Sequence, residues 1–169
     1  MCLITFYWNE SKKYLRLVAN RDEFRIRPTA PAQHWEGWWG GRDLHSYGTW
    51  LAIGERRMAA VTNEREPNNV TGIKSRGEVP IDFVLSHQSA EVYARNFIGK
   101  SYGGLNILLF DGSSMWYASN RSEIQYISTG VHGLSNAQLN TPWPKVNSVK
   151  TAMSNSLVSA VSAITNPYI

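Results

Sequence analysis

Short apolar runs, each followed by a polar turn, recur along the chain, and this pattern limits the folds that are open to it. The first two runs, residues 2–8 and 14–19, flank the polar segment 9–13 and predict a β-hairpin. Further strands are predicted at 49–53, 58–62, 105–110, 115–118, 123–127 and 131–134. The last four of these are expected to form one continuous meander.

Three segments have the apolar spacing of helices, at residues 79–87, 90–98 and about 144–163. The order of strands, helices, more strands and a final helix predicts an α+β fold, or a pair of sheets flanked by helices. We find no repeat, low-complexity tract or linker, so a single domain over residues 1–169 is predicted.

Composition excludes several functional classes. The apolar content of 43% and the charged content of 18% are typical of a globular protein. The net charge of +4 comes without a long basic run, which argues against nucleic-acid binding. The four histidines have no metal-ligand spacing, so no metal or other resident cofactor is predicted. Neither a signal peptide nor a membrane span is found in the sequence, so a cytoplasmic location is expected.

The single cysteine is residue 2, directly behind the start methionine. Removal of Met1 would place a thiol and a free α-amine on one residue, with pKa values near ~8.5 and ~7.7–8.0. A nucleophile with a base beside it is the minimum equipment for covalent acyl chemistry. The alternative is that Cys2 is a small buried residue that opens a strand.

Polar residues stand at the ends of several predicted strands. If the first hairpin forms, Arg21 and Asp22 lie beside Cys2, where an arginine favours thiolate and a carboxylate can hold the amine. Asn63 and Asn136 follow two other strands and are suitable donors for an oxyanion. The alternative for each is a turn cap or a surface ion pair.

Several blocks in fixed order resemble one known family. They are Met1-Cys2, Ala-Asn-Arg-Asp-Glu-Phe at 19–24, Arg-Pro at 27–28, Gly-Thr-Trp-Leu-Ala-Ile at 48–53, Ala-Ala-Val-Thr-Asn at 59–63, Ser-Arg-Gly-Glu at 75–78, the segment 102–108, Gly-Leu-Ser-Asn-Ala at 133–137 and Thr-Pro-Trp-Pro-Lys at 141–145. Together they resemble the NRDE family, also called the transport and Golgi organization 2 family. The resemblance spans residues 1 to about 150.

This resemblance implies an N-terminal-nucleophile (Ntn) hydrolase-like fold, a four-layer αββα sandwich of two antiparallel sheets. By analogy with cysteine Ntn hydrolases, Cys2 would be the nucleophile. Arg21 and Asp22 would position it, while Asn63 and Asn136 would contact the oxyanion and the amine. Family members continue beyond residue 169 with a Tyr-Gly-Thr-Arg type segment, so the sandwich is expected to be incomplete at the C-terminus.

Two functions follow from these observations. The first is hydrolysis of a non-peptide C–N amide bond through Cys2. The second is binding or trafficking of haem or of a lipid or acyl ligand, as implied by eukaryotic relatives that act in Golgi organisation and secretion. A third reading is a family fragment with neither activity.

In the binding alternative the aromatic segment 35–50 would line an apolar pocket. Iron ligands would come from Cys2, His34, His45, His87 and His132. The expected partners are a small amide, acyl or haem-like molecule. A second copy of the chain is also expected, because an exposed sheet edge favours pairing.

Overall fold

A computed structural model describes residues 2–65 and 72–165, with side chains described as far as residue 157. Met1 and part of the polar segment 64–76, whose composition predicts an exposed loop, lie outside the described residues. The predicted N-terminal hairpin is confirmed. It consists of β1 (Cys2–Asn9) and β2 (Tyr14–Arg21), paired antiparallel with Cys2 opposite Arg21.

The hairpin belongs to a three-stranded sheet with the order β10-β1-β2. The strand β10 (Gly130–Leu134) pairs antiparallel with β1, with Leu134 opposite Ile4. The prediction that 131–134 continues the preceding meander is therefore wrong. An apolar run shows that a strand forms, but partner choice between distant segments depends on the packing of the whole domain.

The second sheet has seven strands that follow one another in chain order, with all pairs antiparallel. They are β3 (Thr29–Trp35), β4 (Trp38–Asp43), β5 (Leu51–Gly54), β6 (Arg57–Asn63), β7 (Leu105–Phe110), β8 (Met115–Ser119) and β9 (Gln125–Tyr126). β3 and β4 were not predicted as strands. β3 is an edge strand with a register shift between Ala30 and Gln33, which accommodates Pro31.

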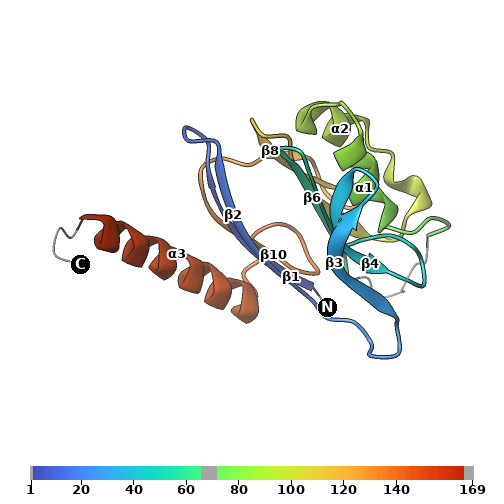
Figure 1. The fold of residues 1–169 in the computed structure, drawn as a ribbon, viewed down its shortest axis with the longest axis horizontal. Helices are drawn as coiled ribbons and strands as arrows, with labels where there is room; N and C mark the ends of the chain where they lie inside the picture. The colour runs from blue at the N-terminus through green and yellow to red at the C-terminus, as the bar shows by residue number, and fades with distance from the viewer. Residues whose placement is uncertain (1, 66–71, 166–169) are drawn as a thin grey trace.

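Helices complete the layers. α1 (Glu78–Leu85), α2 (Ala90–Asn96) and α3 (Pro144–Thr165) match the three predicted helices closely, and a short 3₁₀ turn, η1, spans Gly99–Ser101. Ser89 caps α2, where its side chain accepts a hydrogen bond of 3.2 Å from the Val92 N–H. α1 and α2 cover the outer face of the large sheet, and α3 packs on β1 and β10 (Figure 1).

Two apolar cores hold these layers together. One lies between the large sheet and helices α1 and α2, and it includes Phe83 and Ile107. The other lies between the two sheets, around Phe6 and Leu108. Adjacent residues of β7 thus enter different cores, because successive side chains of a strand point to opposite faces. This explains why residues 105–110 form an unbroken apolar run.

The predicted α+β class, with two stacked antiparallel sheets between helices, is confirmed. At the α3 side, a Cβ atom on Gly133 would lie 2.7 Å from Val146 Cγ1, so glycine permits the close approach of α3 to β10. The Ntn-hydrolase-like assignment of this fold stays a prediction from the resemblance.

Candidate functional site

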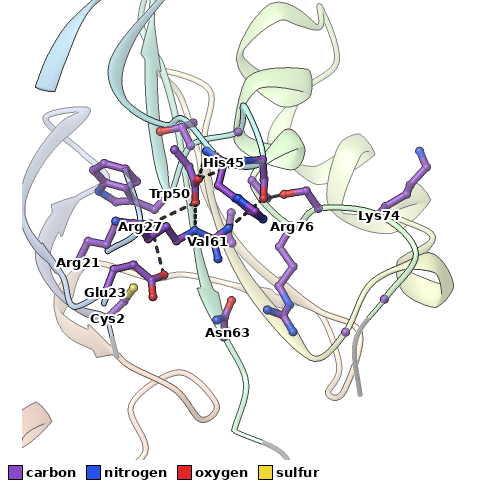
Figure 2. Close-up of a pocket in the computed structure, with 18 of the residues that line it drawn as sticks. Cys2, Arg21, Glu23, Arg27, His45, Trp50, Val61, Asn63, Lys74 and Arg76 are labelled. Atoms are coloured by element: carbon purple, nitrogen blue, oxygen red, sulfur yellow. Dashed lines mark hydrogen bonds and ion pairs between the residues drawn. The ribbon is translucent and has the colours of Figure 1, made fainter. Parts of the chain in front are cut away.

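A pocket with a volume of about 610 Å³ opens at the ends of β1, β2 and β6. Its lining is mostly polar and charged, and it includes all five residues that the sequence nominated: Cys2, Arg21, Asp22, Asn63 and Asn136. These residues come from four separate segments of the chain, and the pairing of β1 with both β2 and β10 brings three of those segments to one edge. We call this cavity the Cys2 pocket (Figure 2).

Cys2 is partly buried at the start of β1. Its backbone carbonyl accepts a hydrogen bond of 2.7 Å from the Ser135 hydroxyl, which ties β1 to the segment after β10. Burial raises the pKa of the Cys2 thiol, while the backbone N–H of Asp22 and the charge of Arg21 act in the opposite direction. Because burial is the larger effect, the thiol is mostly protonated at neutral pH and needs a base to react.

Arg21 is directed mainly away from the thiol. It donates hydrogen bonds to Asp43 at 3.2 Å and to Thr29 at 3.1 Å, and it lies 3.4 Å from Glu23. Its guanidinium also stacks over Trp50, 4.6 Å from the ring centroid. These contacts order the pocket wall, and the charge of Arg21 favours the thiolate form of Cys2 by lowering its pKa, against the larger effect of burial.

Asp22 approaches Cys2 through its backbone. The backbone N–H of Asp22 forms a hydrogen bond with the Cys2 sulfur that favours the thiolate. The carboxylate accepts a hydrogen bond of 2.9 Å from Asn20 Nδ2. The predicted place of this residue beside the cysteine is thus seen, and contact of its carboxylate with the α-amine stays a prediction.

Asp43, which the sequence analysis missed, is the most heavily bonded carboxylate of the pocket. It accepts hydrogen bonds from Arg27 Nε at 2.6 Å, from the His45 N–H at 2.9 Å and from the Ser46 N–H at 3.2 Å, in addition to the one from Arg21. Burial would raise the pKa of Asp43, but these donors outweigh burial and hold the pKa below its usual value. Asp43 thus stays charged and fixes two arginines.

The two asparagines have different environments. Asn136 is buried, its Nδ2 donates to the Asn63 carbonyl at 2.8 Å, and its Oδ1 accepts from the Ser135 hydroxyl at 3.3 Å. These bonds make Asn136 a tether between β6 and the segment after β10. The side chain of Asn63 is exposed and lines the pocket. Of the two, Asn63 is better placed to donate to a ligand.

The segment 72–77 forms the wall opposite Cys2 and brings Lys74, Ser75 and Arg76 to the pocket. It is anchored where the Thr49 N–H donates to the Gly77 carbonyl at 2.8 Å. A Cβ atom on Gly48 would lie 2.6 Å from the carbonyl carbon of Gly77, so only glycine allows this approach. The polar composition of residues 64–76 predicts an exposed loop and does not indicate that part of this segment lines a pocket.

His45 is the histidine that lines the Cys2 pocket, whereas His34 lies on β3, His87 follows α1, and His132 lies on β10 and bonds Ser128 and Asn140. Within residues 2–65 and 72–165, no cluster of three His, Cys, Asp or Glu side chains has the arrangement of a metal site.

The aromatic segment 35–50 is divided between two cavities. Trp50 lines the Cys2 pocket beneath Arg21, but Trp35 and Trp38 stack on each other and line a separate cavity of about 370 Å³. The expectation that this segment lines a single apolar pocket is therefore wrong, because its strands turn the tryptophans to different sides. As for membranes, none of the helices in the described part of the chain is long and apolar enough to span one.

Comparison with known proteins agrees with the sequence blocks. The family model described as Transport and Golgi organisation 2 matches residues 1–166. The Transport and Golgi organization 2 homologs of Mus musculus, Bos taurus and Homo sapiens are each 35% identical to this chain over 167 aligned residues. The alignments cover 86% of the chain but 60% of each relative's length. The chain belongs to the Transport and Golgi organisation 2 family.

Proposed function

We propose that this chain is an N-terminal-nucleophile amidohydrolase that uses Cys2 to hydrolyse a non-peptide C–N amide bond. The observation that carries the proposal is that Cys2, Asp22 and Asn63 line one pocket although they are far apart in sequence. A thiol, a carboxylate and an amide donor in one cleft provide a nucleophile, a group that can hold the α-amine, and a donor for an oxyanion.

In the proposed reaction Met1 has been removed, so that Cys2 carries a free α-amine. The amine accepts the thiol proton as sulfur attacks the amide carbon, and Asn63 Nδ2 donates to the oxyanion that forms. The C–N bond then breaks, the departing nitrogen takes the proton from the α-ammonium, and a thioester remains on Cys2. Water gives a proton to the same amine and attacks the thioester, which releases the carboxylic acid and restores the thiol.

The raised pKa of the thiol explains why this chemistry needs the α-amine. A thiol with a raised pKa has little thiolate at pH 7, so it reacts slowly unless a base is within reach. The α-amine of an N-terminal cysteine is such a base and is attached to the same residue. A blocked amine would leave a weak nucleophile in the same pocket.

The test compares two preparations of the protein, one that begins at Cys2 and one that retains Met1. Each is treated with p-nitrophenyl hexanoate, an activated acyl donor, and the adduct is located by intact and peptide mass spectrometry. We expect acylation of Cys2 to be roughly 100-fold faster when the amine is free. Cys2→Ala should remove the adduct, and Asp22→Ala should slow its formation. Equal rates for both preparations, or for wild type and Asp22→Ala, would contradict the proposal.

A second candidate function is binding of haem as a cargo, and it has one observation in its favour. His45 and Cys2 both line the Cys2 pocket, and both residue types are known axial ligands of haem iron. The names of the relatives refer to transport and Golgi organization, which fits a carrier. Titration of haem into micromolar protein should then shift the Soret band, and His45→Ala should abolish the shift. An unchanged Soret band would leave only an acyl or lipid ligand for this alternative.

The cytoplasmic location is also part of the proposal, because haem or acyl carriage and amide hydrolysis could each take place there. Fluorescent tagging at the C-terminus, which leaves Cys2 untouched, tests it. We expect a diffuse signal. Retention of the tagged protein in an organelle would contradict this location.

A further inference from the structure

The two walls of the Cys2 pocket differ in charge. Arg21, Asp22 and Glu23 stand beside Cys2, whereas the opposite segment 72–77 contributes two cations, Lys74 and Arg76. Figure 2 shows Cys2 on one side, Arg76 on the other and Asn63 between them. A ligand that spans the pocket therefore passes from a wall of mixed charge, with two carboxylates and an arginine beside Cys2, to a basic wall.

The other cations of the pocket are bound to acidic side chains. Arg27 Nε lies 2.6 Å from Asp43, and Arg21 lies 3.2 Å from Asp43 and 3.4 Å from Glu23. Lys74 is 3.2 Å from Glu78, and its side chain is 56% exposed, so water screens its charge.

The backbone around Arg76 is held by several hydrogen bonds. Arg76 is half-buried. The next residue, Gly77, accepts a hydrogen bond of 2.8 Å from the Thr49 N–H at its carbonyl, and its own N–H donates to the Ser75 hydroxyl at 3.3 Å. The Val79 N–H donates to the carbonyl of Arg76 itself at 3.3 Å, at the start of α1. An arginine on a backbone fixed at several points is preorganised to bind a ligand.

We propose that the substrate of the Cys2 site carries an anionic group, a carboxylate or a phosphate, which Arg76 binds while the scissile amide lies against Cys2. The guanidinium fork matches the oxygens of either anion with two parallel hydrogen bonds. The amide end of this assignment rests on the proposed function, whereas the anion end rests on the charge of the walls and on the position of Arg76. The carboxylate of Asp22 sets the direction, because it would repel an anion placed beside Cys2, whereas Glu23 is paired with Arg21.

Binding is measured by calorimetry on the Cys2→Ala protein, so that the result needs no turnover and is separate from the proposed function. The probes are N-hexanoylglycine, N-hexanoylaminoethyl phosphate and the neutral N-hexanoylglycinamide. We expect at least one anionic probe to bind roughly tenfold more tightly than the neutral probe. The stronger of the two anions identifies the group, and the preference should weaken as salt is raised.

Arg76→Gln should remove the preference, and Arg76→Lys should keep part of it. The matched control is Arg16→Gln, because Arg16 is exposed on β2 and outside the pocket lining. Arg76→Glu should reverse the preference in favour of the cationic N-hexanoylethylenediamine, a gain that misfolding cannot imitate.

Equal binding of all probes by the Cys2→Ala protein would overturn the anion site, as would a preference that survives Arg76→Gln. These outcomes do not depend on whether Cys2 reacts. If the anion preference is found and Cys2 is not acylated by p-nitrophenyl hexanoate, the proposed hydrolysis fails and the anion site stands. If Cys2 is acylated but charge makes no difference to binding, the anion site fails and the proposed hydrolysis stands.

Discussion

β2 and β6 connect two unlike cavities. Both strands end at the Cys2 pocket, with Arg21 and Asn63, and both begin at a second cavity of about 570 Å³. The second cavity, which we call the apolar groove, also has Lys13, Arg56 and Arg57 in its lining, but most of its surface is apolar and comes from residues such as Leu15, Leu17, Leu51, Ile53, Met58 and Phe110. The two ends of the same strands thus present surfaces of opposite character.

The two cavities differ in the contacts that their side chains make. At the Cys2 pocket, charged groups bond one another, as Asp43 does with Arg21 and Arg27. At the apolar groove, Ile53 is still 39% exposed and its partner across the strands, Trp39, is 44% exposed. A polar ligand suits the first end, and the apolar surface of another chain suits the second.

The largest effect is expected from Asp43→Ala, which tests whether ion pairs hold the pocket end together. Two arginines and two backbone N–H groups would lose their acceptor in a mostly buried place, since the Asp43 side chain is 12% exposed. Removal of one partner from such a cluster costs about 3 kcal/mol of unfolding free energy. Urea denaturation measures the loss.

Glu23→Ala is the matched control, because Glu23 also pairs with Arg21 but at 3.4 Å and with 28% of its side chain exposed. We expect a loss of less than about 1 kcal/mol. Similar losses for the two variants would mean that Asp43 does not organise this end of the molecule. The comparison between the two ends would then lose its physical basis.

The sequence predicts the fold where the signal is local. The hairpin of β1 and β2 follows from two β-prone runs and one polar turn, and β5 and β6 follow in the same way. β3 and β4 escaped prediction because Pro31 and the glycines of β4 disfavour a strand, and neighbouring strands supply the pairing that overrides this preference. The prediction that β10 continues the meander was wrong because β10 pairs with β1, which lies far from it in the sequence.

The same limit applies to the site: the sequence predicts the residues that local strand pairing brings together. Cys2, Arg21 and Asp22 were found because strand pairing places the start of β1 beside the end of β2. Asp43 was missed because its importance depends on Arg21 and Arg27, which reach it only after β2, β3 and β4 have assembled. Arg76 was quoted only as part of a family block, and nothing in its sequence neighbourhood places it across a pocket from Cys2.

Acid should lower the unfolding free energy through carboxyls at both cavities, and this effect should be smaller than that of Asp43→Ala. Backbone N–H groups of Ala90, Ser113 and Ser114 outweigh the burial of Asp111, next to the apolar groove, and hold its pKa at about 2. The pKa of Asp43 is also lowered. A carboxyl whose pKa is lower in the folded than in the unfolded state stabilises the protein above the unfolded value of about 3.9, and this contribution is lost as the pH falls through the folded value.

Urea midpoints at pH 7, 5, 4 and 3 measure this loss in wild type, Asp43→Asn and Asp111→Asn. Each variant should lose less stability between pH 5 and pH 3 than wild type does, because one proton-binding site has been removed. Added salt should reduce the contribution of Asp43 more than that of Asp111, since Asp43 forms ion pairs with two arginines, whereas the hydrogen-bond donors to Asp111 are neutral and its cationic neighbour is Arg57. Parallel pH curves for all three proteins would show that neither carboxyl carries the acid sensitivity.

The smallest change in stability is expected from Ile53→Lys, which tests whether the apolar groove binds a second copy of the chain. β2 is the outer strand of its sheet among the described residues, and the groove lies between this strand and β5. Because Ile53 is 39% exposed, the lysine can reach water, and the unfolding free energy should change by less than about 0.5 kcal/mol. Light scattering at high concentration should show wild type associating and Ile53→Lys monomeric.

The control is Ile98→Lys, at a site 75% exposed near the end of α2, which should associate as wild type does. A wild type that stays monomeric would contradict self-association, and association that survives Ile53→Lys would show that the groove is not the contact.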